Sequence, residues 1–291
     1  MNIDGEQLAA LAAVIDEGTF EAAARRLHVT PSAVSQRIKA LELSVGQVLV
    51  RRSRPCRATD GGDVLVRLAG QLALLETEAL RAIGGAGPAV RVPIAVNADS
   101  LSTWFPGVVA GLPEGVLVDL RREDQDHSAQ LLRDGSVMAA VTSDARAVQG
   151  CRVRPLGAMR YLALASPAYR ARWFGDGVHA GSLAHAPLLT FNRQDSLQER
   201  FLALVAGAQP SPPVHYVPSS SAFVELVRHG LGWGMVPDVA GRPLVDQGAL
   251  VELAPGRHLD VPLYWQHWKL DSRTLDEVTR RVSLAAAEAL H

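Results

Sequence analysis

The chain has 291 residues, of which 48% are hydrophobic and 20% are charged, and its formal net charge is −1. About 150 residues per domain predicts two domains or three small ones, and no apolar run reaches the ~18 residues of a membrane-spanning helix. The first 30 residues lack the pattern of a secretory signal. The two cysteines, Cys56 and Cys151, are far apart, which argues against a disulfide framework or a zinc finger and favours a cytoplasmic location.

Charge is unevenly distributed along the chain. Residues 20–57 contain eight arginines and lysines against two glutamates, a net charge of +6, so the rest of the chain is acidic. A compact basic segment in an acidic protein indicates an anionic partner, although a solvated basic face would explain the charge alone.

The first 60 residues are expected to form three helices and a small hairpin. Leu8, Leu11, Ala12 and Ile15 have helical spacing, Gly18 ends that helix, and Thr19 caps a second. Thr30 followed by Pro31 starts a third helix, which Gly46 closes. Its predicted buried positions are Val34, Ile38, Leu41 and Val45. Residues 48–51 and 57–59 are expected to pair around a basic tip at Ser53, Arg54 and Pro55.

A long helix is predicted from residue 59 onward. Its near-heptad stripe favours pairing with a second copy of the same helix. The stripe consists of Val64, Leu68, Leu72, Leu75 and Ala79. Residues 84–88 have the composition of a linker.

After residue 90 the pattern predicts alternating strands and helices. We expect strands at 92–96, 116–120, 137–141, 161–165 and 187–191. We expect helices at 100–110, 128–133, 196–205, 221–228 and 272–290. This alternation is typical of an α/β fold, here two lobes with a mostly parallel sheet.

The third helix has a polar face suited to DNA. Ser32, Ser35, Gln36 and Lys39 lie at helical spacing opposite its predicted buried face, and small polar groups there can reach base edges. Thr30, Lys39, Arg52 and Arg54 are placed to hold phosphates. A three-helix protein-interaction module is the alternative.

The segment from Phe20 to Glu42, with its AAARRLHVTPSAVSQRIKALE pattern, strongly resembles the winged helix-turn-helix of LysR-type transcriptional regulators. The resemblance extends over the whole chain, although Val50 replaces a frequent phenylalanine before the wing. It implies base contacts from Pro31, Ser32, Ser35 and Gln36, with Arg52 and Arg54 near the minor groove or backbone. It also implies double-stranded operator DNA and RNA polymerase as partners, and assembly into dimers or dimers of dimers.

The implied architecture has an N-terminal winged helix-turn-helix (1–60), a dimerising linker helix (61–84) and a two-lobed Rossmann-like effector domain (85–291), similar to a periplasmic binding protein. Lobe I is expected at about 90–162 and 266–291, and lobe II at about 163–265. In the resembled family, a small effector lies in the cleft between the lobes.

Two hydroxyl clusters and an acidic run are candidate effector contacts. Ser100 and Ser102 open a predicted helix and could bind a carboxylate, or simply cap that helix. Ser219 and Ser221 form a second cluster. Glu123 and Asp124 follow a strand at the edge where α/β sheets bind ligands, although a solvated loop is equally expected.

The stretches NADSLSTW, GAMRYLALAS, PSSSAFVELVRHGLGWGMVP and PLYWQHW resemble the LysR-type subgroup that senses lysine or arginine and activates a basic amino acid exporter gene. Glu123 and Asp124, with Asp99 as a further candidate, would meet the cationic groups of such an effector. Thr142 is a cleft contact by family analogy only.

Other functions remain open from the sequence. The chain has no nucleophile elbow, P-loop or H-E-x-x-H motif, so we expect no enzyme, no cofactor and no metal. A LysR-type regulator with a different effector is the main alternative. A less specific architectural DNA-binding protein is the second, and it would show steep salt dependence with little sequence preference.

Overall fold

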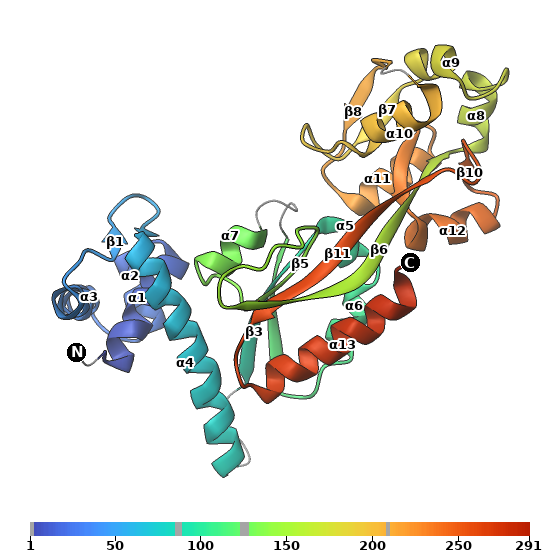
Figure 1. Ribbon diagram of the computed structural model, residues 1–291. Coiled ribbons are helices and arrows are strands. Elements are labelled where there is room, and N and C mark those ends of the chain that lie inside the picture. Colours follow the sequence, from blue (N-terminus) through green and yellow to red (C-terminus); the bar gives the residue numbers. More distant parts are fainter. Residues whose placement is uncertain (1–2, 85–88, 123–127, 208–209) are drawn as a thin grey trace. The chain divides into compact units, whose positions relative to one another are not determined.

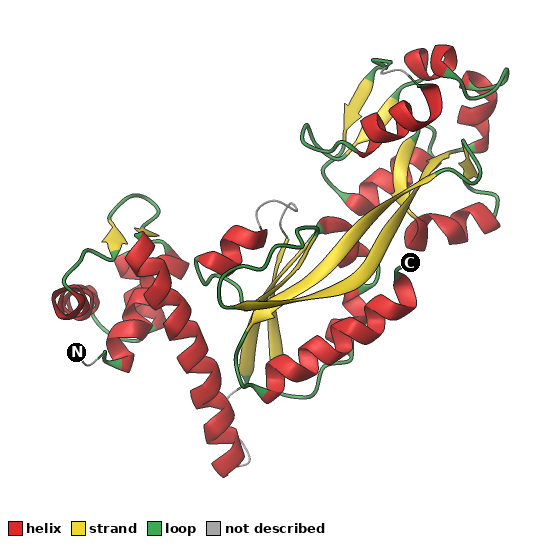
Figure 2. Cartoon of the chain, viewed as in Figure 1, coloured by secondary structure: helices red, strands yellow, loops and turns green. Residues whose placement is uncertain are grey.

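The computed structural model describes residues 3–84, 89–122, 128–207 and 210–291 (Figures 1 and 2). The chain forms two compact units. Unit 1 comprises Met1–Val96, Gly111–Arg154 and Trp265–Arg281, and unit 2 comprises Asn97–Ala110, Pro155–Tyr264 and Val282–His291. These units divide the chain differently from the expected lobes, because residues 97–110 and the end of the C-terminal helix belong to unit 2.

Unit 1 begins with the three expected helices, α1 (Gly5–Glu17), α2 (Phe20–Arg26) and α3 (Pro31–Val45). Thr19 and Thr30 cap α2 and α3 by accepting backbone N–H groups, and Gly18 and Gly46 end α1 and α3 in the left-handed conformation. The wing is the antiparallel pair β1 (Val50–Arg51) and β2 (Arg57–Ala58). Local sequence signals therefore account for the end of α1, the start of α2 and both ends of α3.

Helix α4 (Asp60–Gly84) has two different faces. Leu65, Val66 and Ala69 are buried in the core that they share with α1, α2 and α3. Most of the expected stripe lies on the other face, where the exposed fraction is 55% for Val64, 39% for Leu68 and 36% for Leu75. Leu72 of the stripe is half-buried and packs against the core instead. Within one chain Val64, Leu68 and Leu75 are uncovered, as a face that pairs with another copy would be.

Three strands of unit 1 form parallel pairs within a larger sheet. Strand β3 (Val90–Val96) pairs with β4 (Val116–Arg122) and with β5 (Ala139–Thr142), and helix α7 (Ser128–Arg133) precedes β5. Helix α13 (Arg273–Ala289) starts in this unit, where the Trp265 indole N–H donates to the Thr279 hydroxyl at 3.0 Å.

Unit 2 contains the remaining elements. The helices are α5 (Ala98–Ser102), α6 (Phe105–Ala110), α8 (Pro167–Trp173), α9 (Ala180–His185), α10 (Leu197–Ala206), α11 (Ser220–Arg228) and α12 (Asp238–Asp246). The strands are β7 (Leu188–Thr190), β8 (Val214–Tyr216), β9 (Gly234–Pro237) and β10 (Val251–Glu252). Strands β6 (Cys151–Ala165) and β11 (His258–Trp268) each run from one unit into the other.

Two expectations about this region were wrong. The sheets are mixed rather than mostly parallel, because β6 pairs antiparallel with both β9 and β10, while β7 pairs parallel with β8. The single helix expected at 100–110 is two short helices, α5 and α6. Thr103 leaves the helical region (φ −117°, ψ −85°), and Pro106 lacks the N–H that would continue the hydrogen-bond ladder.

Gly62 lies where α4 contacts the segment before the wing, and a substitution there tests how close this contact is. A Cβ at Gly62 would overlap the carbonyl oxygen of Leu49, which cannot move away as a flexible side chain would. We expect Gly62→Ala to lower the free energy of unfolding by about 2–3 kcal/mol. Gly70→Ala on the same helix is the control, because its Cβ would meet Trp268 at an ordinary 3.7 Å. Equal denaturant midpoints for the two variants would contradict the expectation.

Candidate functional sites

The DNA-facing candidate residues lie on α3, which packs through one side only. Val34, Ile38 and Leu41 are at most 1% exposed. On the other side Ser32, Gln36 and Lys39 are exposed and Ser35 is half-buried. The Thr30 hydroxyl accepts the Ala33 N–H and lies 2.9 Å from the Ser32 hydroxyl, so Thr30 serves as the helix cap. The start of α3 thus presents small polar groups on a rigid helix.

Two contacts fix this helix and the wing. The Arg37 guanidinium pairs with the Glu6 carboxylate on α1. Glu42 Oε1 accepts the Leu49 N–H at 2.9 Å, which joins the end of α3 to the start of the wing. On the wing Arg54 is exposed and the Arg52 guanidinium lies 5.1 Å from the centre of the Phe20 ring. The geometry suits phosphate contacts from the wing and base contacts from α3.

Gln36 is the strongest candidate for reading a base, because an exposed amide can make two hydrogen bonds to an adenine edge. We expect Gln36→Ala to weaken binding to the preferred site by about 1–3 kcal/mol and to relax preference at one base pair. Arg54→Ala is the comparison, because loss of a phosphate contact weakens binding to all sequences alike. Gel-shift titrations on matched and single-base-substituted sites measure both. A uniform loss for Gln36→Ala would contradict base reading.

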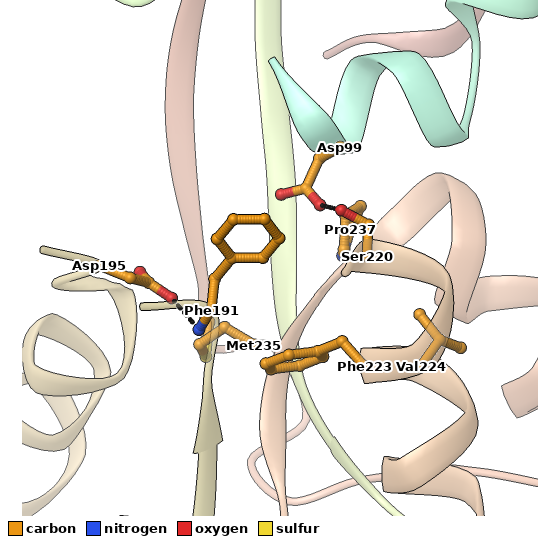
Figure 3. Close-up of a pocket in the computed structure, with 8 residues that line it drawn as sticks. All are labelled: Asp99, Phe191, Asp195, Ser220, Phe223, Val224, Met235 and Pro237. Atoms are coloured by element: carbon orange, nitrogen blue, oxygen red, sulfur yellow. Dashed lines mark hydrogen bonds between the residues drawn. The ribbon is translucent and has the colours of Figure 1, made fainter. Parts of the chain in front are cut away.

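A second candidate site lies in unit 2 around Asp99, in the first turn of α5 (Figure 3). The Asp99 carboxylate accepts the Tyr161 hydroxyl of β6 at 2.6 Å and the Ser220 hydroxyl of α11 at 2.7 Å. A cavity of about 20 Å³ lies beside it, with Asp195 at its far wall and apolar side chains between. The apolar lining consists of Phe191, Phe223, Val224, Met235 and Pro237.

The Asp99 pocket is lined by two acidic side chains and by no basic side chain among the described residues. Burial raises the pKa of Asp99, the negative charge of Asp195 raises it further, and the hydrogen bonds from Ser220 and Tyr161 oppose the shift. Burial and the Asp99 charge raise the pKa of Tyr161 well above its usual value. In the described chain, no arginine, lysine or histidine forms an ion pair with Asp99 or Asp195. Two carboxylates on an apolar pocket without a cation favour a positively charged ligand.

Asp195 is held rigidly in place. Its Oδ2 accepts the Phe191 N–H at 3.0 Å and the Thr190 hydroxyl at 3.1 Å, and its Oδ1 accepts the Leu197 N–H at 3.0 Å. These three hydrogen bonds fix the position of the Asp195 carboxylate beside the pocket.

The predicted hydroxyls are close to Asp99 and Ser220 along the chain, but their hydrogen bonds differ from those expected. Asn97, rather than Ser100, caps α5, and the buried Ser100 hydroxyl has no hydrogen-bond partner among the described residues. The Ser102 hydroxyl donates to the Asp99 carbonyl at 3.1 Å. Ser219 caps α11 through the Ala222 N–H, and its hydroxyl lies 3.4 Å from that of Ser221. Binding of a carboxylate by these serines stays a prediction.

The other expected effector contacts are Thr142, Glu123 and Asp124, and effector binding by them stays a prediction. Thr142 is buried in unit 1, where its hydroxyl accepts the Asp144 N–H at 3.1 Å. Glu123 and Asp124 lie outside the described residues. Sequence reasoning missed Tyr161, Asp195 and Ser220. Tyr161 lies in the GAMRYLALAS stretch, and Ser220 stands between Ser219 and Ser221 in the second hydroxyl cluster, so the signal for both was the motif in which they occur.

The described part of the chain shows neither the side-chain cluster of a metal site nor a membrane-spanning helix. No group of three or more histidine, cysteine, aspartate or glutamate side chains there is arranged to hold a metal ion. None of the helices described combines the length and apolar composition needed to cross a bilayer.

A winged helix joined through a long helix to an α/β region with a ligand pocket defines a ligand-responsive transcriptional regulator. Residues 6–63 match the model of the bacterial regulatory helix-turn-helix proteins of the lysR family, and residues 85–282 match the LysR substrate binding domain. The chain belongs to the LysR family of transcriptional regulators.

The similarity to individual relatives and to solved structures extends over nearly the whole chain. The HTH-type transcriptional regulator LysG of Mycobacterium tuberculosis is 54% identical over 98% of this chain and 94% of its own. The crystal structure of ArgP from the same species is similar with a TM-score of 0.90 and 52% identity, covering 100% of this chain and 99% of that one.

A third relative is described together with a ligand. The lysine export transcriptional regulatory protein LysG of Corynebacterium glutamicum is 44% identical over 98% of both chains. The full-length structure of LysG from this species with bound effector Arg is similar with a TM-score of 0.79 and 41% identity over 99% of both chains.

Proposed function

We propose that this regulator responds to a basic amino acid, L-lysine or L-arginine, and activates a gene for a basic amino acid exporter. The observation that carries the proposal is the buried Asp99 carboxylate, which faces an apolar pocket with Asp195 and has no cationic partner among the described residues. The names and bound effector of the similar LysG and ArgP proteins support the same ligand class. Regulation of export follows the Corynebacterium relative by analogy.

The size of the pocket indicates which part of the effector enters it. A volume of about 20 Å³ is close to that of one water molecule, and therefore to that of an ammonium group or one edge of a guanidinium. The side-chain methylenes would lie against Phe191, Phe223 and Met235. The α-carboxylate would then remain outside, where the exposed Ser102 is the predicted contact; the buried Ser100 hydroxyl is not within reach from there.

We propose that the effector alters DNA binding through the arrangement of the chains in a dimer or dimer of dimers. Pairing of the exposed stripe on α4 would place two α3 helices on a partly palindromic operator. The effector would favour one arrangement of the assembly, by no more than its difference in affinity for the two states, and so make the promoter available to RNA polymerase. We propose no catalytic role, and the DNA partner implies that the protein works in the cytoplasm.

A DNA-binding titration tests the proposal. The protein is titrated on the DNA upstream of its own reading frame at fixed salt, with L-lysine, L-arginine or L-norleucine, which has the lysine chain without its ammonium group. A footprint or affinity that changes with L-lysine or L-arginine only is expected. Specific binding that ignores both would leave the regulator and remove this effector class. Equal affinity for unrelated DNA would instead support the architectural alternative.

The raised pKa of Asp99 predicts a pH dependence of effector affinity. A cation binds the ionised carboxylate, so binding requires Asp99 to lose its proton. As pH falls through the raised pKa, the affinity for L-arginine should fall, by up to about tenfold per pH unit below that pKa. Calorimetric titrations between pH 5 and pH 8 measure it. An Asp99→Asn variant that kept the same pH profile would assign the titration to another group.

A further inference from the structure

Unit 2 contains a second and larger cavity, between α10 and the pair of strands β7 and β8. Its volume is about 140 Å³, whereas the Asp99 pocket has about 20 Å³. An apolar cavity of about 150 Å³ holds a benzene molecule, so this space accepts a ligand of five to seven non-hydrogen atoms or more at an open rim. Asp195 lines both cavities.

Two opposite charges line this cavity without pairing. Arg193 lies after β7, and its guanidinium stacks over the Tyr216 ring at 4.7 Å from the ring centre. Glu199 lies on α10. Among the described residues neither side chain has an ion-pair partner, and no ion pair joins the two. Asp195 already accepts three hydrogen bonds from Thr190, Phe191 and Leu197. The Arg193 Nη1 group also donates to the Tyr216 hydroxyl at 3.5 Å. The other N–H groups of the guanidinium and the Glu199 carboxylate are therefore available to a ligand.

A buried amide adds a third polar group. Gln198 is only 3% exposed and lines the cavity. Its Oε1 lies 3.4 Å from the Thr190 hydroxyl, and its Nε2 has no hydrogen-bond partner among the described residues. Rotation of the amide by 180° would only exchange which end lacks a partner. A buried amide group without a partner is costly, which indicates a polar group supplied from the cavity.

We propose that this cavity binds a neutral α-amino acid with a small apolar side chain. The ligand carboxylate pairs with Arg193 and accepts the Gln198 N–H, and the ligand ammonium pairs with Glu199. The apolar side chain lies against Leu188, Leu202 and Val214, which also line the cavity. The site is separate from the basic amino acid pocket at Asp99 and takes a ligand of different charge.

Calorimetric titration of the full chain with L-valine tests this assignment. We expect a dissociation constant of about 1 mM or tighter. 3-Methylbutanoate, which lacks the ammonium group, and isobutylamine, which lacks the carboxylate, should each bind about tenfold more weakly or worse. Equal binding of either analogue, or absence of L-valine binding at millimolar concentrations, would overturn the proposal.

Single substitutions locate the ligand. Arg193→Gln and Glu199→Gln should each weaken L-valine binding about tenfold or more. Arg200→Gln, an exposed arginine on α10 outside the cavity lining, should not. Thermal unfolding checks that the variants fold, and their unchanged affinity for L-arginine separates this site from the proposed effector site. L-Valine binding that is lost in Asp99→Asn and kept in Arg193→Gln would place the ligand in the first pocket and overturn the second site.

Discussion

Replacing Asp99 with asparagine is expected to reduce the affinity for L-arginine and L-lysine about 100-fold or more. The variant keeps the size of the side chain and one of the two oxygens that accept the Tyr161 and Ser220 hydroxyls; the other hydroxyl would face the amide NH2 and can turn to accept from it. It removes the charge that would pair with the ligand cation. Losing one partner of a largely desolvated charge pair typically costs 2–5 kcal/mol in binding. Calorimetric titration with both amino acids measures the loss. Operator binding without effector should remain, because Asp99 belongs to unit 2 and the DNA-facing helix to unit 1.

The same substitution is expected to stabilise the protein when no effector is bound. The pKa of Asp99 is raised in the folded state, so the folded protein binds its proton more tightly than the unfolded chain does. Stability therefore falls as pH rises from the unfolded pKa through the folded one, and the cost persists at neutral pH. Each kcal/mol by which Asp99→Asn raises the free energy of unfolding should raise Tm by about 2–4 °C.

Asp246→Asn is the matched control, because Asp246 is an exposed carboxylate at the end of α12 in the same unit. It should change neither affinity nor Tm. An Asp99→Asn protein that binds L-arginine like the wild type would remove the Asp99 pocket as the effector site. A lower affinity together with a lower Tm would indicate that Asp99 stabilises the fold, and that its role is not mainly to bind a ligand.

The double substitution Leu68→Glu and Leu75→Glu is expected to produce a folded monomer with operator affinity reduced about 100-fold or more. Both side chains are exposed within one chain, so glutamates there remain hydrated and leave the fold of the single chain intact. In a dimer formed through the α4 stripe, two charges per helix would have to leave water. A monomer then holds one half-site only, and the contacts of the second half-site are lost.

Analytical ultracentrifugation measures the oligomeric state, and a gel-shift titration measures operator affinity. Ala73→Glu is the control, because Ala73 is an exposed position on α4 outside the stripe. It should leave both measurements unchanged. A Leu68→Glu, Leu75→Glu protein that sediments as a dimer would show that another surface joins the copies.

Local sequence determined where the N-terminal helices begin and end at four positions, and which face of α4 is apolar. Thr19 and Thr30 cap their helices, Gly18 and Gly46 end theirs, and Val64, Leu68 and Leu75 of the expected α4 stripe are exposed. Each of these signals acts within one or two turns of helix, between residues close in sequence. Such interactions form in the same way whatever the rest of the chain does, so a pattern along the sequence is enough to predict them.

Only the tertiary structure determines which residues form the Asp99 pocket and how the strands of the sheet pair. The hydroxyls of Tyr161 and Ser220 reach Asp99 from positions 62 and 121 residues further along the chain. The antiparallel pairing of β6 with β9 is equally remote in sequence. The sequence of a strand reveals its apolar pattern but does not reveal which strand it pairs with. Likewise, a run of three serines does not reveal which of the three hydroxyls will point into the protein. Those choices depend on how distant segments pack together, because burial and hydrogen-bond partners belong to the folded chain as a whole.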